Sequence, residues 1–145
     1  MRLQESTSFV AVALAVVAVT IVTDMIIAEL SISVFAWAKS AWKTEIQARP
    51  TEFYLLHSLL SQIVYLLVAV LVTAVFGIRG AIIMGGVLVS DHLAYPLIAR
   101  VQRGISIPST GLWHDALTYV TATVSGAVLG LALRRLWRQR TRSSP

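Results

Sequence analysis

The stretch FVAVALAVVAVTIVTDMIIA, residues 9–28, holds a single charged residue, Asp24. About 20 apolar residues are enough for an α-helix to cross the hydrocarbon core of a bilayer. A chain in lipid must also satisfy its own backbone hydrogen bonds, which only helices and closed barrels do. The stretch therefore predicts a membrane-spanning helix with one acid inside it.

The rest of the chain repeats this pattern. Of its 145 residues, 57% are apolar and 13% are charged, a much more apolar balance than that of an average soluble domain. Apolar runs predict four spans, at about residues 8–30, 55–76, 81–99 and 112–133. We therefore expect a single all-α transmembrane domain over residues 1–145, folded as an integral membrane four-helix bundle.

Arginines after the last span set the expected orientation. Cytoplasmic flanks of membrane proteins are enriched in Lys and Arg, so residues 134–145 are predicted to form a basic cytoplasmic tail. Four crossings then place the N-terminus in the cytoplasm too. We expect the tail to contact anionic lipid, and not nucleic acid, because no folded basic domain accompanies it. The arginines are Arg134, Arg135, Arg138, Arg140 and Arg142.

The segment between the first two spans, residues 31–51, predicts an interfacial amphipathic helix in the first external loop. Apolar residues recur there at helical spacing, while the lysines fall largely elsewhere. Pro50 is expected to break this segment before the second span begins. The apolar positions are Phe35, Ala38, Trp42 and Ile46.

Each predicted span also carries polar residues on one helical face. Because consecutive spans run in opposite directions, these stripes reach the same outer half of the bilayer, which favours a shared polar cavity. Pro96 predicts a kink in the third span, since its ring displaces the carbonyl of His92. The stripes contain Tyr54, His57, Ser58, Ser61, Gln62 and Tyr65 in the second span and His114, Thr118, Thr121 and Ser125 in the fourth.

All three histidines lie near an acid, as Glu52/His57, Asp91/His92 and His114/Asp115. Ionisable residues inside spans usually face a cavity and mark a site or a pathway. Imidazole and carboxylate are ligands for zinc or manganese, whereas the absence of cysteine excludes thiolate sites. Neighbouring residues point about 100° apart on a helix, so one member of each adjacent pair is expected to turn aside. The candidate metal ligands are His57, His92 and His114, and the candidate catalytic acids are Asp24, Asp91 and Asp115.

Small residues mark the expected contacts between helices. Ala122, Gly126 and Gly130 recur every four residues on the last span, a pattern that lets helices approach closely. Ala11, Ala15 and Ala18 offer a comparable face on the first span. We expect these rows to form seams within the bundle, with contacts between copies of the chain or within a larger complex as the alternative.

Two short motifs resemble those of the membrane-bound metal-dependent hydrolase family. They are Leu56-His57-Ser58-Leu59-Leu60, and Gly86 to Leu93 with its Ser90-Asp91-His92 core. The resemblance implies a small helical bundle that binds a metal, with His57 and His92 as ligands and Asp24 as an early acidic position.

Three functional classes follow from these residues. A metal-dependent hydrolase would hold a divalent metal, zinc or manganese, at the His/Asp site. A proton- or ion-conducting protein would use the same acids without a metal. A non-catalytic accessory or holin-like subunit would depend on the small-residue seams and the basic tail instead.

Overall fold

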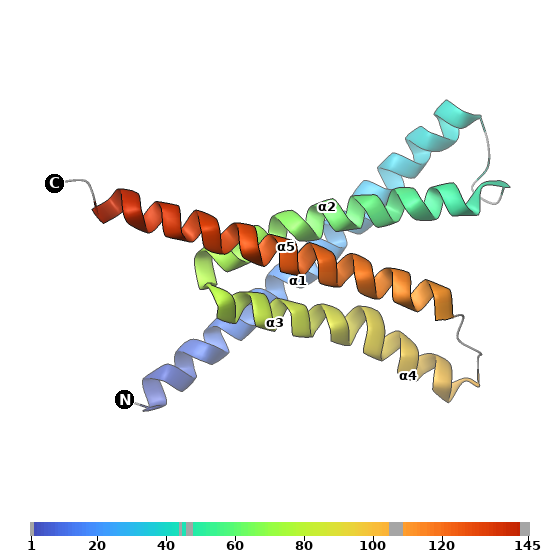
Figure 1. Ribbon diagram of the computed structural model, residues 1–145. Coiled ribbons are helices and arrows are strands. Elements are labelled where there is room, and N and C mark those ends of the chain that lie inside the picture. Colours follow the sequence, from blue (N-terminus) through green and yellow to red (C-terminus); the bar gives the residue numbers. More distant parts are fainter. Residues whose placement is uncertain (1, 44, 46–47, 105–108, 143–145) are drawn as a thin grey trace.

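The computed structural model consists of helices joined by short connections (Figure 1). It describes residues 2–43, 45, 48–104 and 109–142, without the side chains of residues 2–8, 50, 95, 96, 99, 100, 109–116 and 142. No strand occurs among these described residues. The helical elements, in chain order, are α1 (Arg2–Trp42), α2 (Pro50–Phe76), α3 (Ile78–Val89), the π-helix η2 (Ser90–Ala94), α4 (Tyr95–Gln102) and α5 (Ser109–Arg142).

Three helices in the described part of the chain are long and apolar enough to cross a membrane. The qualifying stretches are Phe9–Trp42, Thr51–Phe76 and Leu117–Thr141. They match three of the four predicted spans. The remaining predicted span, residues 81–99, is divided among α3, η2 and α4. The protein is thus an all-helical membrane protein, and its fourth crossing stays a prediction.

The segment expected to form a separate interfacial helix belongs to α1, which continues without a break to Trp42. The expected apolar face is covered by α2. The rings of Phe35 and Trp42 lie edge-on against Phe53, with centroids 5.3 and 5.4 Å away, and Ala38 is fully buried. The segment therefore packs against a neighbouring helix, and its position in the membrane interface stays a prediction. Ile46 lies outside the described residues.

Two helix boundaries also differ from the prediction. The chain breaks before the second span, as expected, but Pro50 lies on the helical side of the break and begins α2. The first helical position tolerates proline, because its missing N–H has no partner within the helix there. At the other end of the chain, α5 runs to Arg142, so the arginines expected in a tail lie on the last turns of a helix.

The most extensive helix contact joins α2 and α5, which run side by side in the same direction (Figure 1). Gly126 and Gly130 lie against the α2 backbone. A Cβ atom built on Gly126 would come within 2.8 Å of the Leu66 carbonyl oxygen, and one on Gly130 within 2.6 Å of the Val70 carbonyl oxygen. The predicted small-residue seam on α5 is confirmed as a contact within the chain.

The core lies where α1, α2, α3 and α5 meet. Large side chains from three of these helices are fully buried there, among them Val16, Tyr65 and Met84. On α1 the buried face contains Val16, Thr20, Thr23 and Ile27. The alanine row predicted to pack on this helix points elsewhere, because Ala11 and Ala18 are exposed.

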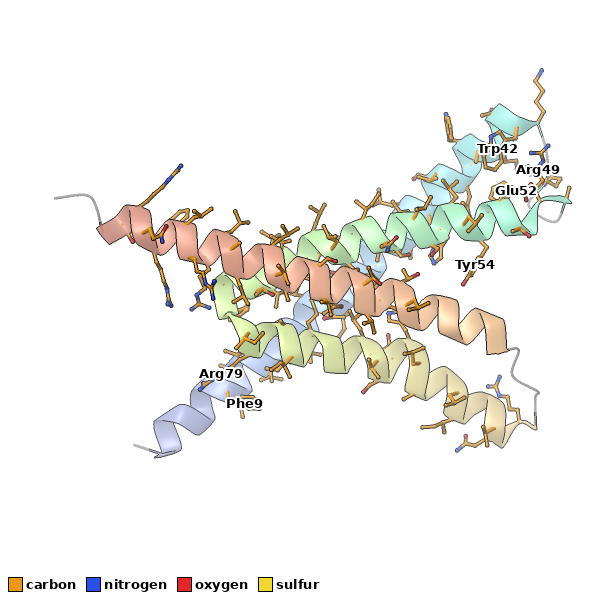
Figure 2. The ribbon with its side chains drawn as sticks, viewed as in Figure 1. Phe9, Trp42, Arg49, Glu52, Tyr54 and Arg79 are labelled. Carbon is orange, nitrogen blue, oxygen red and sulfur yellow. The ribbon has the colours of Figure 1, made fainter. Side chains whose placement is uncertain are left out.

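The two ends of the molecule carry different residues. Trp42, Arg49, Glu52 and Tyr54 gather at one end, and Arg79 lies toward the other (Figure 2). Helix α1 begins and helix α5 ends at this second end of the molecule (Figure 1). There the Arg134 guanidinium covers Gly77, the positive-φ residue between α2 and α3. The assignment of this end to the cytoplasm stays a prediction.

Substituting Gly126 with alanine should destabilise the protein, because the new methyl group would meet backbone atoms of α2. We expect a loss of about 1–3 kcal/mol in the free energy of unfolding in detergent. Gly86→Ala is the matched control, since a Cβ atom there meets nothing within 4 Å. The control should be neutral or slightly stabilising. Equal stability of the two variants would contradict the close α2–α5 seam.

Candidate metal centre

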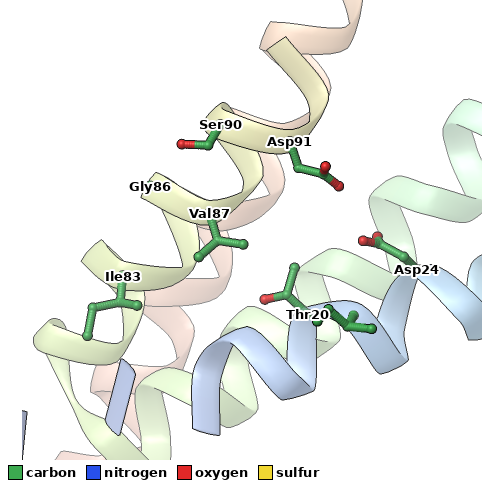
Figure 3. Close-up of a pocket in the computed structure, with 8 residues that line it drawn as sticks. Thr20, Asp24, Ile83, Gly86, Val87, Ser90 and Asp91 are labelled. Atoms are coloured by element: carbon green, nitrogen blue, oxygen red, sulfur yellow. The ribbon is translucent and has the colours of Figure 1, made fainter. Parts of the chain in front are cut away.

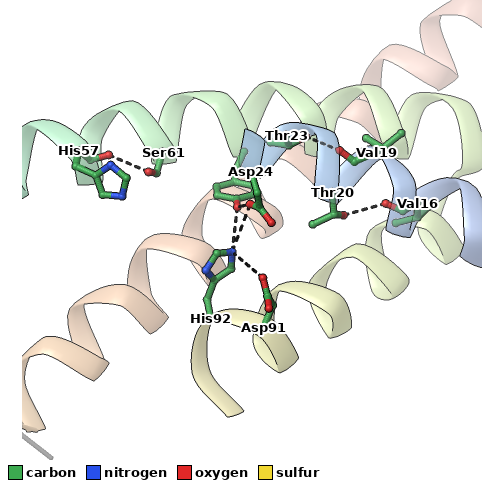
Figure 4. A network of polar contacts seen from close by, with 10 residues as sticks. Val16, Val19, Thr20, Thr23, Asp24, His57, Ser61, Asp91 and His92 are labelled. Carbon is green, nitrogen blue, oxygen red and sulfur yellow. Dashed lines mark hydrogen bonds and ion pairs between the residues drawn. The ribbon is translucent and has the colours of Figure 1, made fainter. Parts of the chain in front are cut away.

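Two helical segments bring three potential metal ligands together. Asp24 comes from α1, and Asp91 and His92 come from η2 (Figure 4). One ligand atom from each residue lies within 4.8 Å of the others. The His92 Nε2 atom is 3.6 Å from an Asp24 oxygen and 3.9 Å from an Asp91 oxygen. Two candidate acids and one candidate ligand from the sequence thus share one place.

The π-helix η2 positions two of these residues. Pro96 has no N–H to offer the His92 carbonyl four residues earlier, so a regular α-helix cannot continue through this turn. The chain forms η2 over Ser90–Ala94, and the helix changes course between α3 and α4 (Figure 1). The predicted irregularity next to His92 is confirmed. Such π-turns occur frequently at functional sites.

Asp91 and His92 differ in burial, as expected for neighbouring helical positions. The side chain of His92 is 24% exposed and that of Asp91 is 59% exposed. Both nevertheless reach the same group of ligand atoms. One of the two side chains is thus more exposed, as expected, but neither turns away from the candidate metal centre.

Tyr65 of α2 connects two of the candidate ligands. Its hydroxyl donates a hydrogen bond to Asp24 Oδ1 and lies 3.0 Å from His92 Nε2. A phenol has a single proton to donate. With that proton directed at Asp24, the contact with His92 requires the imidazole to donate from Nε2. Tyr65 is only 1% exposed, so it fixes this network from inside the core.

Tyr119 of α5 completes the surroundings of His92. The two rings are stacked, with centroids 4.3 Å apart and planes 16° apart, and Tyr65 meets the Tyr119 ring edge-on at 5.3 Å. The sequence prediction missed Tyr119. Tyr119 precedes Ala122 by three residues, and Ala122 precedes Gly126 by four. This spacing puts Tyr119 on the same helical face as the small-residue seam, a signal that could have found it.

A groove of about 610 Å³ opens beside the two carboxylates, between α1 and the α3–η2 segment (Figure 3). Polar groups lie at the end that contains Asp24 and Asp91, and aliphatic side chains line the rest. The carboxylates can therefore be reached from the groove, while His92 contacts the tyrosines. The lining residues are Thr20, Ile21, Asp24, Ile83, Gly86, Val87, Ser90 and Asp91.

His57 lies apart from this group. Its Nδ1 atom is 2.9 Å from the Ser31 hydroxyl of α1. It precedes Tyr65 by eight residues on α2, a rise of about 12 Å along the helix. Glu52, the acid expected to accompany His57, lies 4.0 Å from Arg49 instead. The His57 side chain thus joins α2 to α1 and is not part of the candidate metal centre.

His114 and Asp115 belong to the first turns of α5, but their side chains lie outside the part of the chain that the structure describes. Their roles as metal ligand and catalytic acid stay predictions.

The three residues offer oxygen and nitrogen atoms of the kind that zinc and manganese accept, and the two separations from His92 can be compared with those around one ion. Metal–ligand bonds of 2.0–2.2 Å place the ligand atoms of one ion about 3.5 Å apart in tetrahedral geometry. The observed separations of 3.6 and 3.9 Å from His92 are close to this value. Coordination requires an unprotonated Nε2, however. A metal held by His92 would therefore require Nε2 to give up its proton, with the neutral ring protonated at Nδ1, and would end the hydrogen bond from Nε2 to Tyr65.

The fold and the site together define the class of the protein: an all-helical membrane protein with a candidate Asp/His metal-binding group between its helices. Comparison with family models, with curated proteins and with solved structures gives no match. The resemblance to the metal-dependent hydrolases thus rests on the two short motifs. Of the ligands that it implies, the structure groups His92 with Asp24 and leaves His57 apart.

The Tyr65–Asp24 hydrogen bond should appear as an energetic coupling. In a double-mutant cycle with Tyr65→Phe and Asp24→Asn, we expect a coupling of about 1–2 kcal/mol in the free energy of unfolding, because the donor and the charged acceptor are lost together. A control cycle pairs Tyr65→Phe with Glu29→Gln, at an exposed acid on α1. Its coupling should be near zero. Additive effects of Tyr65→Phe and Asp24→Asn would contradict the bond.

Proposed function

We propose that the Asp24–Asp91–His92 group binds one divalent cation, zinc or manganese, and that the protein is a metal-dependent hydrolase of the membrane. The observation that supports this is the convergence of three ligand atoms within 4.8 Å, drawn from two helical segments and bordering a groove.

Charge favours a cation at this position. Two carboxylates in an apolar surrounding need protons, donors or counter-ions, because burying an unpaired charge is costly. A divalent cation would balance both. His92 would add a neutral nitrogen ligand, held in orientation by its stack with Tyr119. The site therefore offers the oxygen and nitrogen ligands that zinc and manganese accept.

Three protein ligands suit a catalytic site better than a structural one. Structural zinc sites are closed by four protein ligands, whereas catalytic sites keep a position open. Here the open side would face the groove, since Asp24 and Asp91 line it. A divalent metal at this site would supply Lewis acidity for hydrolysis. The groove walls would hold the substrate beside the carboxylates, with Ile83 and Val87 against its apolar part.

Proton conduction is the second candidate, and the Tyr65 contacts favour it. Tyr65 joins the acid of α1 to the imidazole of η2 by hydrogen bonds, and chains of Asp, Glu and His carry protons in membrane pumps and transporters. In this case Tyr65 and His92 would keep their hydrogen bond during function. A metal would have to break it, so the two candidates need different states of the same nitrogen.

The basic end of α5 is proposed to contact anionic lipid. Arg135 and Arg138 are exposed there, and juxtamembrane cations are attracted to the negatively charged leaflet. We keep a homo-oligomer or a larger membrane complex as proposed assemblies. An accessory or holin-like role would involve neither metal nor proton flux.

Metal analysis of the purified protein in mild detergent tests the first candidate. After zinc or manganese loading and removal of free metal, the wild-type chain should retain about one ion. His92→Ala and Asp24→Asn should each lose most of it, because two ligands hold a metal much less tightly than three. His57→Ala is the matched control and should keep the ion. Absence of metal from the loaded wild type, or equal loss in both histidine variants, would contradict the proposed site.

Proton flux into liposomes tests the second candidate. If the Tyr65 network conducts protons, the reconstituted protein should dissipate a pH gradient, Asp24→Asn should abolish the flux, and a metal chelator should leave it unchanged. Glu29→Gln should conduct like the wild type. Flux that persists in Asp24→Asn, or that a chelator stops, would rule out this metal-free pathway.

A further inference from the structure

A second cavity lies between α2 and α5, separate from the groove of the candidate metal centre. It has a volume of about 140 Å³, and each of its lining side chains carries a polar atom. We call it the vestibule. Its lining residues are Tyr54, His57, Ser58, Ser61, Thr118 and Tyr119.

The vestibule is suited to water. A water molecule occupies about 30 Å³ in the liquid and needs two to four polar partners, so the volume accommodates about four. Its walls offer hydroxyl groups at suitable spacing. Ser58 and Thr118 face each other with their oxygens 3.5 Å apart, a separation at the limit of a direct hydrogen bond. In an apolar surrounding such hydroxyl groups are stabilised by bound water.

The inner end of the vestibule adjoins the candidate metal centre. Ser61 is followed one turn later on α2 by Tyr65, whose hydroxyl contacts Asp24 and His92. Tyr119 lines the vestibule with one part of its side chain, and its ring is stacked on His92. Tyr119, whose ring centroid is 5.3 Å from that of Tyr65, therefore separates the vestibule from the acidic group.

The outer end lies near the start of α2. Among the α2 residues that line the vestibule, exposure falls from 41% at Tyr54 to 3% at Ser61, over a rise of about 10 Å. Tyr54 is at the end of the molecule that also carries Trp42, Arg49 and Glu52 (Figure 2). Tryptophan, tyrosine and charged side chains are typical of the boundary between lipid and water, so the vestibule starts where water is available.

A neighbouring groove of about 310 Å³ provides a contrast. It shares Ser58 and Thr118 with the vestibule, but leucines 55, 59 and 117 form much of its wall. These leucines are exposed on the outside of the chain. The groove is therefore suited to lipid tails, and the Ser58–Thr118 pair marks the boundary between it and the vestibule.

We infer that the vestibule is a water-filled entrance, open from the α2 N-terminal side, that brings water up to Tyr119, whose ring is stacked on His92. The inference goes beyond the proposed function, because it stands on the cavity and its polar lining and not on a bound metal. For a proton conductor, this water would lie next to the Tyr65–His92 network. A hydrolase would instead receive its water and metal from the groove, which Asp24 and Asp91 line.

Cysteine accessibility tests the vestibule directly, since the natural chain contains no cysteine. Ser58→Cys and Thr118→Cys place a thiol on its wall. Leu59→Cys and Leu117→Cys place one on the adjacent residue, facing outward. The reacting species is the thiolate, which apolar surroundings disfavour. In native membranes, a small water-soluble methanethiosulfonate should modify positions 58 and 118 at least about tenfold faster than positions 59 and 117.

The direction of entry needs a further marker. Arg49→Cys replaces an exposed residue just before α2, so its reaction identifies the side of the membrane to which the α2 N-terminus is exposed. A membrane-impermeant reagent should modify positions 49 and 58 from the same side. Equal rates at each adjacent pair, or reaction of position 58 from the side opposite to position 49, would overturn the inference. Loss of metal binding would leave these rates unchanged, so failure of the proposed metal site and failure of the vestibule are distinguishable.

Discussion

The hydrogen bond from Tyr65 to Asp24 is the interaction on which the interior of this protein depends. A carboxylate in the middle of an apolar helix is tolerated only with a proton, a cation or a donor beside it. Tyr65 supplies the donor from a second helix and also contacts His92 and Tyr119 from two further segments. The need to satisfy one acid thus fixes how several helices face one another.

Two features of the backbone make this arrangement accessible. Gly126 and Gly130 let α5 approach the α2 backbone closely, which places Tyr119 next to Tyr65. The π-helix before Pro96 lets Asp91 and His92 reach one place although they are adjacent in the chain. The close approach and the irregular turn supply the geometry, and the side chains supply the chemistry. In the metal proposal the His92 Nε2 atom would bind the ion, and in the proton proposal it would keep its hydrogen bond to Tyr65.

Much of this architecture could be predicted from the sequence, because apolar runs and small-residue spacing are local signals. Three spans, the α5 seam and the irregular turn near His92 follow from single stretches of chain. The convergence of Asp24, Asp91 and Tyr65 also follows, since alternating helix directions bring their polar stripes to one level.

What could not be predicted is which partner each side chain meets. Successive residues on a helix point about 100° apart, so a small error in the facing direction changes the partner. His57 contacts Ser31, and Tyr119, which is absent from the predicted site, stacks on His92. Likewise, Trp42 at the end of α1 meets Phe53, which comes from another helix.

The most direct test of the shared interior is a cross-link between α1 and α3 in native membranes. Thr20→Cys and Val87→Cys place thiols in the groove that Asp24 and Asp91 also line, and they leave the Tyr65 network intact. With no other cysteine in the chain, a short bifunctional thiol reagent should join the two positions within one chain, as detected by mass spectrometry of the linked peptides. The same reagent should not join position 20 to a cysteine at position 137, an exposed site near the end of α5. Reactive thiols at positions 20 and 87 without a link between them, or links only between separate chains, would contradict the account.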